Sequence, residues 1–287
     1  MANLRERHFD STQVKGRYRQ RVEIYVEGKD DSALFKNCWF SDLIDRVDFI
    51  EAENGPINHP GCEGVRKNVA VQRQRGIPAY GVIDRDALPD VLLANETDDS
   101  SYFSQTSNQY SHLHYTLLWE IENYLIDPEA LEQYRADSKT MGEARPIAVV
   151  EKEIREHCEA LLPHAACNAL LQTIGKKKLP DEYTNVHADR ISVAQHIHTT
   201  ELPKYDSAAQ SAYIQNLAQV DAFDDPSQTD RVRIRMLKRR IHGKALLKRF
   251  AYQHKLKGEI PFHVARKIST MQSPLNELRD QIEVWLS

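Results

Sequence analysis

The chain has 287 residues, of which 41% are hydrophobic and 28% are charged, and its formal net charge at pH 7 is −4. These values are typical of a globular protein and exclude a disordered or low-complexity chain. The length suits one large domain or two smaller ones. No apolar stretch approaches the roughly 20 residues that a membrane-spanning helix needs, so we predict no membrane association.

The N-terminus and the cysteines bear on localisation. Residues 1–21 are rich in arginine but are followed by no long apolar segment, so we expect no secretory signal there. The four cysteines have no Cys-x-x-Cys spacing, which favours reduced thiols over disulfides or a zinc site. We therefore expect a cytoplasmic protein.

The charge is distributed unevenly along the chain. Residues 1–150 contain 17 Lys and Arg against 25 Asp and Glu, whereas residues 151–287 contain 21 against 17. An acidic half and a basic half suit a protein that binds cations in one place and polyanions in another. A two-domain protein with uneven surfaces would show the same imbalance.

The first 135 residues alternate between strand patterns and helix patterns. In VEIYV, at 22–26, apolar residues alternate with Glu23 and Tyr25, which is typical of a strand. Further strands are predicted within 46–55, 78–87 and 112–126, helices over 30–40 and 61–75, and a polar loop over 88–111. This alternation favours an α/β fold, with a largely parallel sheet flanked by helices.

Strand patterns stop beyond residue 145. Helices are predicted over 147–174, 206–220, 229–256 and 274–286. We therefore expect an α/β domain over 1–140 and a mainly helical region over 141–287. The sequence contains no G-x-x-x-x-G-K-[ST] phosphate-binding loop.

Each of the first three predicted strands ends in an acid, a glycine or both. These ends are Glu27-Gly28, Asn54-Gly55 and Asp84-Arg85-Asp86. Ligands collect at the carboxyl ends of parallel strands, and Mg²⁺ needs only two or three carboxylates because it keeps several waters. An acid beside a glycine also forms turns and helix caps, and a lone Asp-x-Asp is a weak pattern. Acidic patterns after two strands together favour a metal site.

These strand ends resemble the TOPRIM domain of topoisomerases, bacterial primases and OLD nucleases. The resemblance lies in Glu27-Gly28, in Gly55, and in Asp84-x-Asp86. Four stretches also resemble TOPRIM-like effector subunits of ATPase-linked bacterial anti-phage systems, over nearly the whole chain. They are VEIYVEGKDD, YGVIDRDA, LWEIENYLIDPEAL and IHGKALLKRF, in that order. The first two are specific to TOPRIM, and the last two are short but separate this branch from primases and topoisomerases.

The resemblance implies a Rossmann-like TOPRIM fold with a helical C-terminal region and a nuclease that depends on Mg²⁺ or Mn²⁺. Glu27, Asp84 and Asp86 would bind the metal and serve catalysis. Glu122 stands where OLD-like nucleases keep a further acid, and Lys244 where that branch keeps a basic residue.

The residues themselves leave some of these roles open. Glu122 is also explained as an acid favoured by the first turn of a helix. Glu120 competes with Glu122 for the place of the further acid. Lys244 is also explained as one more cation in a basic run.

The resemblance also implies a biological setting. An ATPase subunit would hold the chain inactive, and the released chain, as a homodimer, would cleave host nucleic acid, with tRNA as the substrate known for its relatives. Two other hypotheses stay open: a TOPRIM DNA nickase or RNA-maturation nuclease of nucleic-acid metabolism, and a non-catalytic partner of an ATPase. The residues alone do not separate RNA from DNA.

Residues 231–258 form the strongest nucleic-acid pattern, with eleven Lys and Arg and no acid. Ordinary solvated helix faces mix both signs of charge, so this imbalance favours binding to a polyanion. Gly243 would divide the segment into two helices. The candidate phosphate contacts are Arg231, Arg235, Lys238, Arg239 and Lys248.

Overall fold

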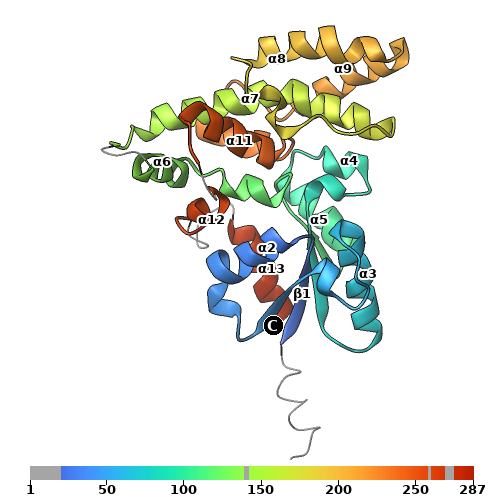
Figure 1. Cartoon of the computed structure of the whole chain (residues 1–287). Coiled ribbons are helices and arrows are strands. Elements are labelled where there is room, and N and C mark those ends of the chain that lie inside the picture. The colour runs from blue at the N-terminus through green and yellow to red at the C-terminus, as the bar shows by residue number, and fades with distance from the viewer. Residues whose placement is uncertain (1–20, 139–141, 258–259, 269–274) are drawn as a thin grey trace, which may run out of the picture. The chain divides into compact units, whose positions relative to one another are not determined.

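The computed structural model describes residues 21–138, 142–257, 260–268 and 275–287. The chain divides into two compact units (Figure 1): a first unit of residues 1–83, 112–114 and 279–287, and a second unit of residues 84–111 and 115–278. This division differs from the expected boundary at 140/141, because residues 84–111 and 115–138 belong to the same unit as the C-terminal helices. In the described residues no helix is long and apolar enough to cross a membrane.

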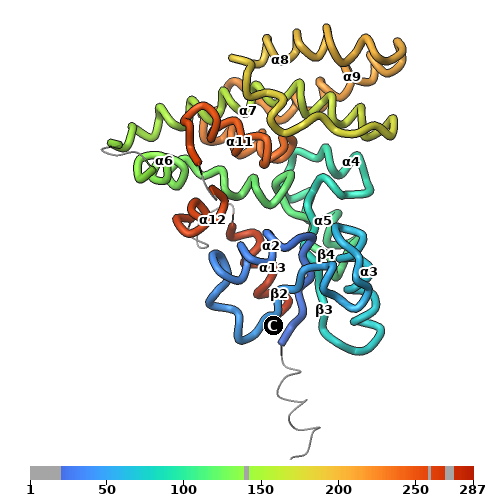
Figure 2. Tube along the Cα trace, in the orientation of Figure 1, coloured from blue at the N-terminus to red at the C-terminus, as the bar shows by residue number. Residues whose placement is uncertain are grey.

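The first unit is built on a four-stranded sheet in the order β2-β1-β3-β4 (Figure 2). Strand β1 (Val22–Val26) pairs in parallel with β2 (Val47–Glu51) on one side and β3 (Ala79–Ile83) on the other. The short strand β4 (Leu113–Tyr115) follows β3 in the sheet. The four strands lie where the sequence predicts them, although each of the last three is shorter than its predicted segment.

Helix α3 (Gly61–Gln74) packs against one face of this sheet, which confirms the helix predicted over 61–75. Gly81 in β3 makes room for it, since a Cβ atom there would lie 2.4 Å from Val65 Cγ1 and 2.9 Å from Leu113 Cδ2. A glycine inside a strand often marks such a close approach.

Helix α2 (Lys29–Leu34) and the end of α13 (Leu275–Leu286) cover the opposite face. Phe35, in the π-helical turn that continues α2, contacts Phe49 of β2 edge to face, with ring centroids 5.4 Å apart. Trp285 of α13 stacks on Tyr80 of β3 at 4.7 Å. Tyr80 precedes Gly81, and successive side chains of a strand point to opposite faces, so α13 and α3 lie on opposite sides of the sheet.

The second unit is mainly helical and is arranged around the long helix α7 (Ile147–Thr173). Five helices pack against α7 (Figure 1): α6 (Pro128–Asp137), α8 (Arg190–His196), α9 (Ser207–Asp221), α10 (Asp230–Leu237) and α11 (Gly243–His254). Helix α12 (Ile260–Ala265) contacts α6. The helices predicted over 147–174, 206–220 and 274–286 are confirmed. The segment 229–256 forms two helices, the second of which begins at Gly243 as expected.

The loop predicted over 88–111 is wrong, because this segment contains α4 (Val91–Ala94) and α5 (Asp99–Gln109). Asp90 caps α4 by accepting from Leu92 N at 2.8 Å, and Asp98 caps α5 by accepting from Ser101 N at 2.7 Å. Asp, Ser, Thr and Asn are common in loops and also at helix N-termini, so the polar composition suggested a loop.

Arg85 belongs to the second unit and has no exposed surface. Its guanidinium donates to four backbone carbonyls, those of Leu93, Ala94, Glu96 and Leu117. The guanidinium carbon also lies 4.2 Å from the ring centroid of Tyr102. Arg85 thus joins the segment after β3 to α4 and to the segment that follows β4.

We expect Arg85→Met to lower the free energy of unfolding by on the order of 3 kcal/mol, because the variant leaves several buried carbonyls without a donor. Urea denaturation measures this loss. The exposed Arg266 provides the control, since Arg266→Met should change stability by at most about 0.5 kcal/mol. Equal stability of the two variants would show that Arg85 does not organise this unit.

Candidate active site

Asp84 and Asp86 follow β3 directly and belong to the second unit. Asp84 Oδ1 accepts a hydrogen bond from Ile121 N at 2.9 Å. The Asp86 backbone N donates to Trp119 O at 3.2 Å, and its Oδ2 pairs with Lys178 Nζ at 3.2 Å. Both aspartates are therefore held to the segment 119–121.

Glu27 follows β1 and belongs to the first unit, whereas the other candidate acids belong to the second. The parallel register pairs Tyr25 of β1 with Gly81 of β3, so these neighbouring strands end at the same edge of the sheet. Glu27 is the first residue after β1, and it is partly buried. Gly28 is the N-cap residue of α2, which agrees with the turn-and-cap interpretation of the pair.

A 3₁₀ turn over Ile121–Leu125 meets the segment 238–244 of the same unit. Trp119 N donates to Lys238 O at 3.0 Å, and Asn123 Nδ2 donates to Ile241 O at 3.1 Å. The second bond joins two of the stretches that carry the family resemblance, LWEIENYL and IHGK, which are more than 100 residues apart in the sequence.

Glu120, just before this turn, is a buried carboxylate with two donors from the segment 242–244. Its Oε1 lies 2.9 Å from His242 Nδ1, and its Oε2 accepts from Lys244 N at 3.3 Å. Burial alone would raise the pKa of Glu120, but the hydrogen bond and charge of His242, with Lys244, lower it to about 2. Glu120 is therefore ionised and committed to holding the start of α11.

Glu122 is oriented differently and pairs with the Lys244 side chain, with Oε1 and Nζ 3.3 Å apart. Burial raises the pKa of Glu122 and the Glu120 carboxylate adds to the rise, although Lys244 opposes it. The carboxylates of Glu122, Glu120 and Asp84 in turn raise the pKa of Lys244, although its partial burial acts the other way. Because each carboxylate oxygen of Glu120 already has a structural donor, Glu122 is the better candidate for the further acid.

Gly243 permits this close approach of α11 to the turn. A Cβ atom at Gly243 would lie 2.6 Å from Asn123 N and 2.8 Å from the carbonyl carbon of Glu122. Both are backbone atoms, which cannot move aside as a flexible side chain would. Gly243 is therefore required for placing Lys244 beside Glu122.

The donors of this site suit a hard cation, since Asp84, Asp86 and Glu122 offer only carboxylate oxygens. Their charges act together on one ammonium group, as the raised pKa of Lys244 shows for Asp84 and Glu122. Within the described residues, no three His, Cys, Asp or Glu side chains are grouped as a ready metal site. In this arrangement the acids pair with Lys178, Lys244 and the Ile121 N–H.

Two of the five residues predicted to contact phosphates in the basic segment are buried. Lys238 is 4% exposed and donates to Ile126 O at 2.8 Å, and its burial lowers its pKa to about 8. Arg239 is 1% exposed, donates to Thr97 O at 2.7 Å and pairs with Asp99. The prediction that Lys238 and Arg239 contact phosphates is wrong for this structure, because their charged ends point into the second unit.

The other three candidates lie nearer the surface. Arg231 pairs with Glu129 and Glu151, and Arg235 is exposed. Lys248 pairs with Asp181 at 2.9 Å and with Glu182 at 2.7 Å.

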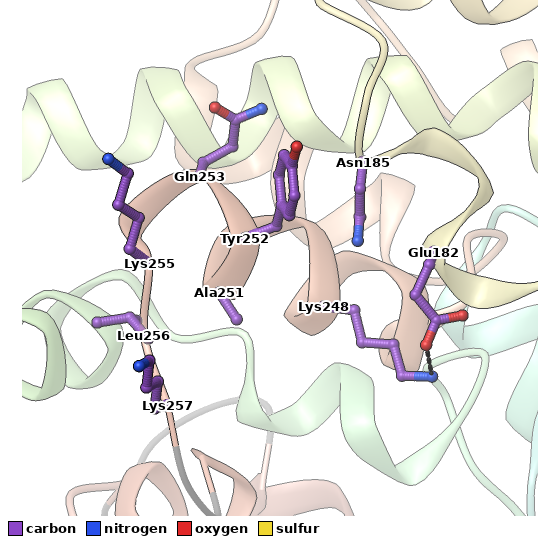
Figure 3. Close-up of a pocket in the computed structure, with 9 residues that line it drawn as sticks. All are labelled: Glu182, Asn185, Lys248, Ala251, Tyr252, Gln253, Lys255, Leu256 and Lys257. Atoms are coloured by element: carbon purple, nitrogen blue, oxygen red, sulfur yellow. Dashed lines mark hydrogen bonds and ion pairs between the residues drawn. The ribbon is translucent and has the colours of Figure 1, made fainter.

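Lys248 lines a cavity of about 610 Å³ at the end of α11 (Figure 3). Lys255, Lys257 and the ring of Tyr252 also line it, and all three side chains are exposed. The exposed cations of the segment are therefore Arg231, Arg235, Lys244, Lys248, Lys255 and Lys257.

The sequence did not connect three residues of this region with the candidate active site: Arg85, Arg240 and His242. Arg85 stands inside the Asp-x-Asp pattern, but the pattern itself assigns no role to the middle residue. His242 precedes Gly243-Lys244, and only its contact with the distant Glu120 reveals its function.

A comparison with protein-family models and with curated proteins finds no match for this chain.

The lowered pKa of Glu120 predicts a pH dependence of stability. A carboxyl group whose pKa is lower in the folded state stabilises the fold above its ordinary pKa, and the contribution is lost as the pH falls. For Glu120 this window runs from about 4.5 down to about 2. The difference in free energy of unfolding between the natural protein and Glu120→Gln should be on the order of 2 kcal/mol near pH 6. It should shrink as the pH falls below 4.5.

Urea denaturation of both proteins at several pH values measures this difference. Glu63→Gln, at an exposed acid of the first unit, is the control and should show a small difference at every pH. A difference for Glu120→Gln that stays constant down to pH 2.5 would contradict an ionised, stabilising Glu120.

Proposed function

We propose that this chain is a metal-dependent endonuclease with a TOPRIM fold, acting as an effector of bacterial anti-phage defence. The observation that carries the proposal is the Lys244 ammonium, 3.3 Å from the Glu122 carboxylate on a turn whose Ile121 N–H is bound by Asp84. The family resemblance adds Glu27 to this set, and Asp86 lies two residues beyond Asp84.

Cleavage of a phosphodiester suits this chemistry. The phosphate gains negative charge in the transition state, and preorganised positive charge nearby lowers the barrier. Lys244 stays protonated because the surrounding carboxylates raise its pKa, so its ammonium is available to stabilise a phosphoryl oxygen. Asp84, Asp86 and Glu122 would hold Mg²⁺ or Mn²⁺, which supplies further positive charge and lowers the pKa of a bound water.

The proposals for the substrate and the partner depend on the sequence resemblance, which includes a resemblance to AriB, the nuclease subunit of the PARIS system. We propose tRNA as the host nucleic acid and an ATPase similar to AriA as the subunit that keeps the chain inactive until infection. Released chains would act as homodimers. The lack of a phosphate-binding loop in this sequence fits regulation by a separate ATPase.

A nuclease assay of the purified chain on DNA and on total RNA tests the activity. We expect RNA cleavage with Mg²⁺ or Mn²⁺ that excess EDTA abolishes. Glu27→Ala, Asp84→Asn and Asp86→Asn should each remove it. Cleavage that persists in EDTA would contradict a metal-dependent mechanism, and cleavage of DNA alone would favour a nuclease of DNA metabolism.

Lys244→Ala separates catalysis from binding. Loss of one transition-state donor should lower turnover by about 10²–10³-fold. Affinity for the substrate should change little, because an interaction made in the transition state affects turnover more than binding. Single-turnover rates and filter binding measure the two effects. Lys177→Ala, at an exposed lysine, is the control, and equal rates for both variants would remove Lys244 from the mechanism.

Co-expression tests the proposed partner. The chain alone should be toxic to bacterial cells, and Glu27→Ala should relieve the toxicity. Expression with the ATPase should also relieve it, through a complex that purifies intact. Growth that is unaffected by the chain alone would favour a non-catalytic partner of the ATPase.

A further inference from the structure

A cavity of about 200 Å³ lies beside Asp86 and within the second unit. Asp86, Trp119 and Arg240 line it, together with residues of α7 and α9. Drug-sized ligands occupy sites of about 300–1,000 Å³, so this volume suits a single ring system. Asp86 and its ion-pair partner Lys178 both line this cavity, and Asp86 is also a member of the candidate active site.

Arg240 is the unusual member of this cavity. It is 5% exposed, and its Nε is buried without a hydrogen-bond partner among the described residues. The guanidinium carbon of Arg240 lies 4.2 Å from the ring centroid of Trp119, so the indole covers one side of the guanidinium. The buried Arg85 and Arg249, in contrast, donate to several backbone carbonyls. Buried charges in proteins are normally paired, so Arg240 is poised for an acceptor.

Two further polar atoms of the same cavity are buried without a partner in the described part of the chain. They are Trp119 Nε1, a donor, and Asn95 Oδ1, an acceptor. With Arg240 Nε, which is unpartnered in the same way, the cavity presents two donors and one acceptor. A ligand that fits it must therefore offer both acceptors and a donor on a small frame.

The rest of the lining favours a nucleobase over a simple anion. Four amide side chains line the cavity besides Asn95: Gln172, Asn216, Gln219, and Asn168, whose amide already bonds to His164 and to the Leu179 N–H. A phosphate ion would need cations and N–H groups alone, whereas a base edge alternates donors and acceptors. Arginine and amide side chains recognise such edges, and proteins that bind single strands place unstacked bases in pockets.

We infer that this cavity binds one unpaired nucleobase of the substrate, next to the phosphate that the candidate active site would cleave. This inference rests on the proposed nuclease function and adds its specificity site. The pocket would select the base beside the cut, through acceptors toward Arg240 and Trp119 and a donor toward Asn95.

Binding of single nucleotides tests the pocket without requiring cleavage. Each of the four ribonucleoside 5′-monophosphates is titrated into the full chain carrying Asp84→Asn, with isothermal titration calorimetry as the readout. We expect one base to bind at least about tenfold more tightly than the others. Trp119→Phe, which keeps a ring but removes the N–H, and Arg240→Lys should each reduce this preference by on the order of tenfold.

Arg266→Lys, at an exposed arginine, is the matched control and should leave the preference unchanged. Circular dichroism of each variant confirms that it is folded before the titrations are compared. No binding by any of the four nucleotides, or an equal preference in folded Trp119→Phe and Arg240→Lys, would overturn the base-binding pocket.

Sequencing of the ends produced from total RNA separates this inference from the proposed function. A base preference at the cut that is lost in Trp119→Phe and Arg240→Lys supports both. Cleavage with the same base preference in these variants contradicts the base-binding pocket but supports the proposed nuclease function. Selective nucleotide binding by a chain that cleaves neither RNA nor DNA supports the pocket and overturns the nuclease.

Discussion

The burial of the Glu120 carboxylate is the constraint on which the candidate active site depends. An ionised carboxylate is unfavourable in the interior unless donors surround it, and here the donors come from His242 and the Lys244 backbone. The start of α11 therefore cannot leave the 3₁₀ turn without stranding a buried charge. The pairing of the exposed Lys244 with the largely buried Glu122 is a consequence of this buried contact, which holds both residues at fixed positions.

The basic segment shows why a count of charges along the sequence does not locate a binding surface. Lys238, Arg239 and Arg249 are all buried, and backbone carbonyls supply most of their acceptors. Carbonyl groups carry no formal charge, so they do not appear in any balance of Lys and Arg against Asp and Glu. A run of eleven cations without an acid is therefore compatible with a structural role for its buried members.

Local patterns predicted much of the fold, because alternation in β1 and helical periodicity in α7 depend on nearby residues. The polar segment 88–111 was misassigned because helix caps and loops use the same residue types. The sequence and its family resemblance made Asp84, Glu122 and Lys244 candidates, but they left Glu120 as a competitor of Glu122 for the role of the further acid. Only contacts with residues more than 100 positions away separate the two, and such contacts leave no local pattern.

Whether a buried cation has an acceptor inside the protein excludes Lys238 and Arg239 from a binding surface. The same criterion identifies Arg240 as a candidate binding residue. These three consecutive cations are all buried, and the first two donate to protein acceptors. Arg240 Nε has no hydrogen-bond partner among the described residues, and its guanidinium lies over the ring of Trp119. A buried polar group that has its hydrogen-bond or ion-pair partners inside the protein contributes to the fold. A buried polar group that lacks such a partner, and that lines a cavity beside catalytic candidates, is a candidate ligand-binding group. The residue with the least local evidence of function in the sequence is thus the one that the packing assigns to recognition.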